Sequence, residues 1–303
     1  MALTINTNIS SLVAQKNLSN ATESLNKAIE RMTTGYKINH AGDNAAGYSI
    51  ARNWETQLGS LDVAADNAAM GSDMMSTLED HYSLISSHLQ RVRDLTEQAA
   101  NGTYGADSLK AIRSEIKARL DEVDRIASNC EYNGRKMMLG EGEGAITGAI
   151  DLQVGLYSSD DSQIELSADL FKSAKISGLF TAAICGTAYA DADAVATACT
   201  GYKADGTAQS GVVPSEMLTK IDKVIKEISN RTTTLGAAQN RIDSAIESIG
   251  VQSENITSSL STLRDADISK ESSNYIKAQI LQQAAATLLS TANQTPSIAL
   301  NLL

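Results

Sequence analysis

The amino-acid sequence predicts a mainly α-helical protein: an elongated rod of long antiparallel helices in a coiled-coil bundle, with a β-hairpin element and a small α+β outer module in the middle of the chain. Aromatic residues make up only 4% of the 303 residues, and there are only 2 prolines. The apolar content is therefore Ala, Leu, Ile and Val, a mixture that favours long helices packed along narrow seams. Apolar residues also recur at alternating steps of three and four over long segments, which is the period of an amphipathic helix.

Three helices are expected in the first half of the chain. Apolar residues at helical spacing predict the first helix over about 5–38, and the segment 39–47 after it is dense in turn-forming residues. The same criterion predicts a second helix over about 45–100 and a third over about 105–129, each followed by an Asn-Gly pair that can end it.

Residues 140–215 have a different character, because they are rich in Gly, Ala, Ser, Thr and Asp. Two short stretches with alternating apolar residues, 152–157 and 163–166, flank the turn-like segment 158–161. This arrangement predicts a β-hairpin. The middle of the chain is therefore expected to form a small separate module.

The most regular pattern in the chain follows Pro214. A seven-residue repeat of this length predicts a supercoiling helix whose seam faces other long helices. Only Thr232, Gln239 and Ser253 interrupt its apolar run. The predicted seam consists of Leu218, Ile221, Ile225, Ile228, Thr232, Leu235, Gln239, Ile242, Ile246, Ile249, Ser253, Ile256, Leu260 and Leu263.

The last segment, from Tyr275 to Leu303, is apolar on more than one face. A thin helical molecule cannot cover all of these side chains by itself, and full burial of one Leu or Ile is worth about 1.5–3 kcal/mol. We therefore expect these residues to be buried against other molecules. They are Ile276, Ile280, Leu281, Leu288, Leu289, Ile298, Leu300, Leu302 and Leu303.

The charge balance excludes several classes of partner. The formal net charge is -11, whereas binding to nucleic acid or anionic lipid requires a basic surface.

No run approaches the roughly 18 apolar residues of a membrane span, so membrane insertion is not expected. The first residues contain neither a basic region nor an apolar region of the kind that a cleavable secretory signal has.

Neither catalysis nor metal binding is predicted, and no cofactor is expected. His81 and His88 are seven positions apart, which is about 10.5 Å along a helix axis. One zinc ion needs both ligands at about 2 Å, so the two histidines are better explained as part of a solvated helix face. No Ser or Thr has His and Asp residues recognisably placed to activate it.

Six segments outside the middle of the chain carry a resemblance to a known family: Met1–Leu12, Ala41–Gly47, Leu89–Thr103, Glu131–Gly134, Arg264–Asp267 and Ala292–Pro296. They closely resemble bacterial flagellin. The resemblance covers about residues 1–140 and 215–303, and it implies a structural subunit that self-assembles into the flagellar filament for swimming motility. It also implies an extracellular protein that leaves the cell through the flagellar export system without a cleaved signal peptide.

The resemblance implies a division of the chain into five segments. The two ends would form the innermost filament domain, the next segments inward would form a coiled-coil core domain, and the middle would be a variable outer module that contains the hairpin. In chain order the segments are 1–44, 45–140, 141–214, 215–266 and 267–303.

The resemblance also implies partners. These are copies of the same chain, a flagellar export chaperone and the export apparatus, the hook-filament junction and cap proteins, and an innate immune flagellin receptor. In the N-terminal segment the implied assembly residues are Ile5, Ile9 and Leu12, which join the apolar residues of the last segment. Two alternatives remain open: a hook-filament junction protein, which shares flagellin-like termini, and an enzyme displayed on the filament, for which no catalytic residues are visible in the middle of the chain.

A more specific implication concerns immune recognition. Seven residues match the positions through which the vertebrate flagellin-sensing Toll-like receptor recognises monomeric flagellin. They are Leu89, Gln90, Arg91, Leu95, Gln98, Glu115 and Arg119.

The cysteines depart from the family pattern, because flagellins usually lack cysteine and this chain has three. Cys185 and Cys199 could form a disulfide outside the cell, where oxidation can occur. Cys130 follows the seam of the third predicted helix, and we expect it to be a small buried apolar thiol.

Overall fold

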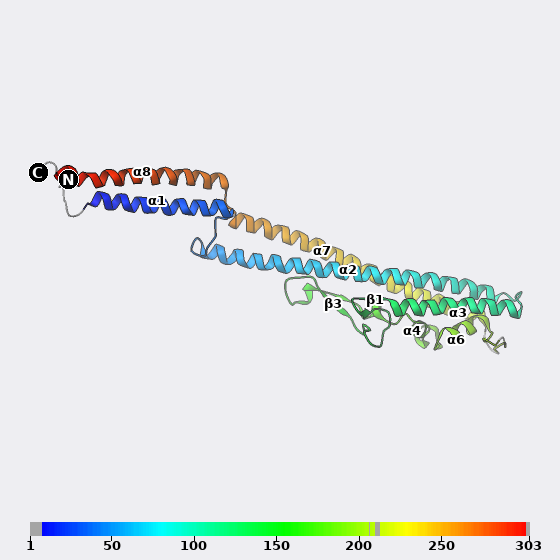
Figure 1. Ribbon diagram of the computed structural model, residues 1–303. Coiled ribbons are helices and arrows are strands. Elements are labelled where there is room, and N and C mark those ends of the chain that lie inside the picture. Colours follow the sequence, from blue (N-terminus) through cyan, green and yellow to red (C-terminus); the bar gives the residue numbers. More distant parts are fainter. Residues whose placement is uncertain (1–7, 206, 210–212, 301–303) are drawn as a thin grey trace. The chain divides into compact units, whose positions relative to one another are not determined.

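The computed structural model describes residues 8–205, 207–209 and 213–300, without the side chains of residues 160, 182 and 295–300. It confirms the prediction of a mainly α-helical protein built from long helices with few short strands (Figure 1). None of the described helices is both long and apolar enough to cross a bilayer. The helices are α1 (Ile9–Thr34), α2 (Ala45–Ala100), α3 (Ala106–Asn129), α4 (Ile176–Leu179), α5 (Ala182–Cys185), α6 (Ala192–Thr200), α7 (Pro214–Arg264) and α8 (Ile268–Leu300). The strands are β1 (Glu131–Tyr132), β2 (Arg135–Lys136), β3 (Ile150–Gln153) and β4 (Gln163–Leu166), and there are short 3-10 turns at Asp160–Ser162 and Ala168–Phe171.

Two compact units make up the fold. The central unit is Ser60–Val251, and the terminal unit consists of Met1–Gly59 together with Gln252–Leu303. Residues 141–214 belong to the central unit and do not form a third one. The boundaries of these units differ from those of the five segments that the family resemblance implies, and that functional division remains a prediction.

Helix α2 carries the longest buried seam of the central unit. Two polar contacts show that α2 and α7 run antiparallel there: Arg93 Nε donates to Asp222 Oδ1 at 2.7 Å, and Gln239 Nε2 donates to Glu79 Oε2 at 3.0 Å. The spacing of the seam alternates between three and four residues, as expected for a helix that supercoils with its neighbours. Its buried residues are Leu61, Ala64, Ala68, Gly71, Met75, Leu78, Tyr82, Ile85, Leu89, Val92, Thr96 and Ala99.

The seam of α7 is partly shifted from its predicted position. Five predicted seam positions are buried, namely Ile221, Ile228, Leu235, Ile242 and Ile249. At the alternate positions the fully buried residues are Met217, Val224, Arg231 and Ala238, each one residue before the predicted one. The predicted residues Leu218, Ile225, Thr232 and Gln239 are half-buried. Adjacent helical positions differ by about 100°, so the packing partners decide which of the two turns inward.

The predicted β-hairpin is present, but its first strand is shorter than predicted. Strands β3 and β4 pair antiparallel from Ile150 opposite Leu166 to Gln153 opposite Gln163. The first strand therefore begins two residues before the predicted stretch 152–157 and ends at Gln153. The side-chain amide of Gln153 donates to the carbonyls of residues 155 and 157, which folds the chain back and ends the strand.

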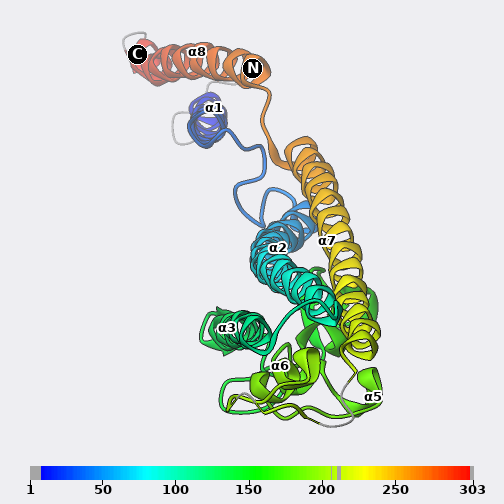
Figure 2. The ribbon, with the colours of Figure 1, turned by 90° about the vertical axis from the view of Figure 1, so that its right-hand side faces the viewer.

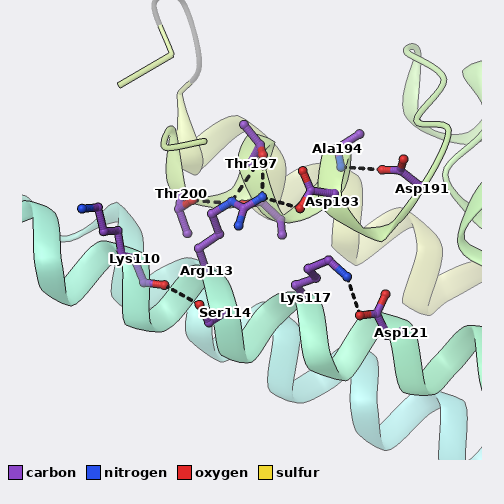
Figure 3. A network of polar contacts seen from close by, with 11 residues as sticks. Lys110, Arg113, Ser114, Lys117, Asp121, Asp191, Asp193, Ala194, Thr197 and Thr200 are labelled. Atoms are coloured by element: carbon purple, nitrogen blue, oxygen red, sulfur yellow. Dashed lines mark hydrogen bonds and ion pairs between the residues drawn. The ribbon is translucent and has the colours of Figure 1, made fainter. Parts of the chain in front are cut away.

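A buried arginine holds residues 141–214, called the middle segment below, against α3. Arg113, nearly inaccessible to solvent, forms an ion pair with Asp193 of α6, and its Nε and Nη2 atoms each lie 3.4 Å from Thr197 Oγ1 (Figure 3). Asp191 caps the start of α6, because its carboxylate accepts a hydrogen bond from Ala194 N at 2.8 Å. Helix α6 is thereby fixed in position along α3, as Figure 2 also shows.

Two further side chains attach the middle segment to the long helices. Arg231 Nη1 donates to the carbonyls of Lys172 and Ser173, at 3.2 Å each, and Tyr82 Oη donates to the carbonyl of Leu170 at 2.8 Å. Burial raises the pKa of Tyr82. Because unpaired backbone groups in an apolar interior are costly, these side chains make it possible for an irregular segment to lie against a packed core.

In the terminal unit, α1 and α8 lie side by side (Figures 1 and 2). Helix α1 ends at Gly35, whose φ of 74° is the left-handed conformation that glycine adopts at helix ends. The connector after it is closed by Asp43, whose carboxylate accepts hydrogen bonds from His40 N and Asn39 N. The bond from His40 is the main cause of the lowered pKa of Asp43.

Candidate functional site

The helices α1 and α8, called the terminal pair below, meet along a seam of small residues. Ala14, Ala21 and Ala28 are buried on α1, and Ala278 and Ala285 are buried on α8. On each helix these alanines are seven positions apart, so they lie on one face. Small side chains allow the two helices to approach closely, but they bury little apolar area.

Polar side chains connect the two helices along their length. Asn8 Nδ2 donates to the carbonyl of Ala292 at 2.7 Å, and Gln282 Nε2 donates to Thr22 Oγ1 at 3.1 Å. At the other end Arg31 lies 3.5 Å from Glu271, whose side chain is 10% exposed. Low residue numbers of α1 thus meet high residue numbers of α8, which shows that the pair is antiparallel.

Most of the predicted assembly residues whose side chains the structure describes are exposed on the terminal pair. Six of them are between 51% and 69% exposed: Ile9, Leu12, Ile276, Ile280, Leu281 and Leu288. Leu289 is half-buried in the seam. Ile5, Leu302 and Leu303 lie outside the described residues, as do the side chains of Ile298 and Leu300. The structure adds Val13, which is 53% exposed and which the sequence reasoning did not single out.

A polar face of the central unit contains most of the predicted receptor residues. Arg91 of α2 donates from both Nε and Nη2 to Glu115 Oε1 of α3, at 3.1 and 3.0 Å, and Arg119 lies 4.0 Å from the same oxygen. Gln90 is exposed, and Gln98 donates to Tyr104 Oη at 2.9 Å. These five side chains are accessible in whole or in part.

The other two predicted receptor residues are placed differently. Leu89 and Leu95 are 0% and 1% exposed. Leu89 belongs to the buried seam of α2, and Leu95 is buried beside the seam residue Thr96. Neither side chain is accessible in the folded central unit, so neither contributes to the polar face, and their contact with a receptor stays a prediction. For Leu89 the sequence pattern already contained the reason, because residues 89, 92, 96 and 99 follow the three-and-four spacing of a buried seam.

The possible disulfide between Cys185 and Cys199 is not formed in this structure. Both residues are free, buried thiols, and so is Cys130. Cys199 lies on the buried face of α6, and the thiol of Cys185 points to the carbonyl of Lys220 at 4.0 Å. Burial raises the pKa of Cys130 and of Cys199 to about 12, and it also raises that of Cys185. The expectation that Cys130 is buried is confirmed.

The part of the chain that the structure describes contains no group of three or more His, Cys, Asp or Glu residues placed to hold a metal ion. His81 Nδ1 lies 2.7 Å from the carbonyl of Thr77 on its own helix. Arg113 and Arg231 are buried polar residues that the sequence reasoning did not identify as such. Arg231 is paired with Glu227, four positions before it, but the other residues that satisfy the two arginines lie 58 or more positions away.

Comparisons with known proteins agree with this architecture. The model of the bacterial flagellin N-terminal helical region matches residues 5–142, and that of the bacterial flagellin C-terminal helical region matches residues 218–303. The flagellar filament 33 kDa core protein of Treponema phagedenis is 30% identical over 304 residues, which cover 99% of each chain. A flagellin of Listeria monocytogenes is 32% identical over 294 residues, 97% of each chain.

A solved structure shares the fold. A putative flagellar hook-associated protein from Vibrio parahaemolyticus is similar with a TM-score of 0.57 at 14% sequence identity, covering 74% of this chain and 100% of that one. This likeness shows the fold alone. The two family regions together match most of the chain, and relatives at least 30% identical match it over nearly its full length, so the chain belongs to the bacterial flagellin family.

Proposed function

We propose that this chain is a structural subunit that assembles with copies of itself into the filament of the bacterial flagellum, and so serves swimming motility. The observation that carries the proposal is the row of exposed apolar side chains on the terminal pair. Membership in the flagellin family supports it, and a relative that matches the chain end to end is named as a filament core protein. A structural role requires no catalysis.

The energy available from assembly is large. Six Ile and Leu side chains of the terminal pair are more than half exposed, and full burial of each would be worth about 1.5–3 kcal/mol. Burial against neighbouring copies would recover most of this free energy at every subunit. The buried alanines of the seam cannot provide it, because they contribute little area.

Family membership also supports the finer parts of the proposal. The protein would be extracellular, exported through the flagellar export system without a cleaved signal peptide. Its further partners would be an export chaperone, the export apparatus, and the hook-filament junction and cap proteins.

The assembly proposal is tested by placing a charge on the exposed apolar surface of α8. Ile280→Glu and Leu288→Glu should remain monomeric at concentrations at which seeded parent protein grows filaments, because each buries an unpaired carboxylate in the contact. Gln279→Glu adds the same charge at an adjacent exposed position and serves as the matched control. Growth is followed by sedimentation and negative-stain microscopy.

Normal filaments from both charged variants would contradict the proposal. A protein that is present only at the base of sheared filaments, and not along them, would favour the hook-filament junction alternative. An enzymatic activity of the parent that disappears on deletion of residues 141–214 would favour the displayed-enzyme alternative.

We further propose that the monomer is recognised by the flagellin-sensing Toll-like receptor through Gln90, Arg91, Gln98, Glu115 and Arg119. The support for this proposal is that these side chains are accessible on one polar face of α2 and α3. Arg91 is the central residue, because its guanidinium already presents two donors to one carboxylate oxygen.

The receptor proposal is tested with Arg91→Ala monomer in a receptor reporter line. Loss of a charged interfacial donor typically costs about 2 kcal/mol or more, which is roughly thirtyfold in affinity. Arg125→Ala is the control, because it removes a similarly exposed arginine paired with Glu122 on α3. If folded Arg91→Ala monomer signals like the parent, Arg91 does not contact the receptor.

A further inference from the structure

The seam of α1 repeats almost identically every seven residues. Ala14, Ala21 and Ala28 are buried, and Leu18 and Leu25 lie half-buried between them. A slide by one repeat moves a helix by about 10.5 Å along its axis and brings an equivalent side chain of α1 back to each contact. The seam of α1 therefore fixes which face meets α8, but it discriminates poorly between registers.

The seam of α8 is similarly repetitive at its alanines. Ala278 and Ala285 are buried and Ala292 is half-buried, again at steps of seven. The residues between them, Tyr275 and Gln282, differ from each other, but both are only half-buried. Packing along the terminal pair thus gives a weak preference for the observed register, and something else must add to it.

The two connectors that lead into the terminal pair meet each other at its end. Lys37 N donates to the carbonyl of Arg264 at 2.7 Å, and Ala266 N donates to the carbonyl of Gly35 at 2.8 Å. These hydrogen bonds join the end of α1 to the beginning of α8. A seven-residue slide would break them, so the register of the helices is coupled to this junction.

The side chain of Arg264 secures the junction. Its guanidinium lies 4.1 Å from the centre of the Tyr36 ring and forms an ion pair with Glu55, near the start of α2. Within the described residues its Nε atom is buried and has no hydrogen-bond partner. A buried donor without an acceptor is unfavourable, so the contacts with Tyr36 and Glu55 must hold the guanidinium in place.

We propose that Arg264 is a positioning residue that sets the register of α1 against α8. It does so by fixing Tyr36, in the first connector, to Glu55 and to the backbone at the end of α7. The register decides which exposed apolar residues of α1 and α8 lie at the same level. The inference therefore specifies how the terminal pair would present a defined surface to other copies, but the register itself does not depend on the assembly proposal.

The register can be read by chemical cross-linking in the full-length monomer. Thr22→Cys combined with Gln282→Cys reports the observed register, because these two side chains are hydrogen-bonded. Thr22→Cys combined with Tyr275→Cys or with Leu289→Cys reports a slide by one repeat in either direction. A short bifunctional thiol reagent distinguishes them, and gel mobility separates intramolecular from intermolecular products.

We expect the parent background to give cross-links almost entirely in the Thr22/Gln282 pair. Arg264→Ala should lower the ratio of native to slipped cross-links by roughly tenfold, since it removes a cation–π contact and an ion pair together. Arg264→Lys keeps a cation above Tyr36 and should restore part of the ratio, which loss of folding would not explain.

Arg52→Ala is the matched control. Arg52 also pairs with Glu55, at 3.0 Å, and lies over a tyrosine ring, that of Tyr48, but both partners are on its own helix. Its removal should leave the cross-linking ratio unchanged. The proposal is overturned if Arg264→Ala keeps the parent ratio, or if it abolishes native and slipped cross-links alike, which would mean that the helices separate. Neither readout requires filament growth, so failure of the assembly proposal would be seen separately.

Discussion

The central unit and the terminal pair are both built on seams that repeat every seven residues, but they bury very different side chains. The large side chains that are most completely buried, including Tyr82, Phe171, Phe180, Leu89 and Leu120, all belong to the central unit. The seam of the terminal pair buries alanines and Glu271. Since burial of apolar area is the main source of stability, the central unit can be stable by itself, whereas the terminal pair depends on what covers its exposed Ile and Leu residues.

The largest expected effect is that of deleting residues 276–303. This removes most of α8, and with it most of the exposed apolar surface, so polymerisation should be abolished. The central unit contributes none of the deleted residues, so its cooperative unfolding transition should keep its midpoint. Circular dichroism and sedimentation of the purified monomer provide the two readouts.

Two outcomes would change the comparison. Filaments of normal length from the truncated chain would show that the terminal pair is dispensable for assembly. A large loss of stability in the central unit would show that the two regions are energetically coupled.

Replacing one leucine in each region should give contrasting stability changes. Leu120→Ala opens a cavity at a side chain that is 0% exposed and should lower the free energy of unfolding of the monomer by about 2–5 kcal/mol. Leu288→Ala changes a side chain that is 62% exposed and should lower it by less than about 0.5 kcal/mol. Urea denaturation of monomers measures both, and equal effects would remove the distinction between the regions.

The two partners of the ion pair between Arg113 and Asp193 should differ in how much their replacement destabilises the protein. Asp193→Ala leaves the buried guanidinium of Arg113 without its charge partner and should cost about 2–3 kcal/mol, less than for a wholly buried pair, because the Asp193 side chain is 47% exposed. Arg113→Met leaves only the accessible carboxylate unpaired and should cost less. Hydrogen exchange in α6 reports both variants, and a larger effect of Arg113→Met would show that the pair acts by another mechanism.

The smallest effect is expected in the chemistry of the thiols. Burial raises the pKa of Cys199 to about 12, so the folded thiol remains protonated at pH 8 and should react only when the central unit opens. A thiol introduced by Ala285→Cys lies in the thin seam of the terminal pair and should be alkylated many times faster. The raised pKa also means that stability falls above about pH 9, the ordinary thiol value, because only the unfolded chain loses this proton there.

Peptide mass spectrometry after alkylation at several pH values measures these rates. Rapid labelling of Cys199 in folded monomer would show that the middle segment detaches from α3. The same experiment would detect a disulfide between Cys185 and Cys199 in freshly sheared filaments.

Much of the fold can be predicted from the sequence, because helical periodicity is a local property. The predicted bounds of the second helix, about 45–100, agree with α2, and Asn133-Gly134 provides the positive φ values that a tight turn between β1 and β2 requires. The excess of apolar residues on α8 is also visible from spacing alone, because no single helix face can contain them.

The tertiary structure decided what depends on distant residues. The spacing of the α2 seam indicates that Leu89 is buried, but Leu95 does not follow that spacing, and only the packing of the central unit shows that it is inaccessible too. On α7 the seven-residue repeat correctly identified five buried positions. Tertiary packing buries Arg231 in place of the predicted Thr232, since Arg231 donates hydrogen bonds to the carbonyls of the middle segment. The sequence around Arg113 and Arg264 likewise does not indicate that their guanidinium groups are withdrawn from solvent or which residues they contact. A charged residue can be buried only where acceptors or an aromatic ring meet it, and the chain brings those partners together only when it folds.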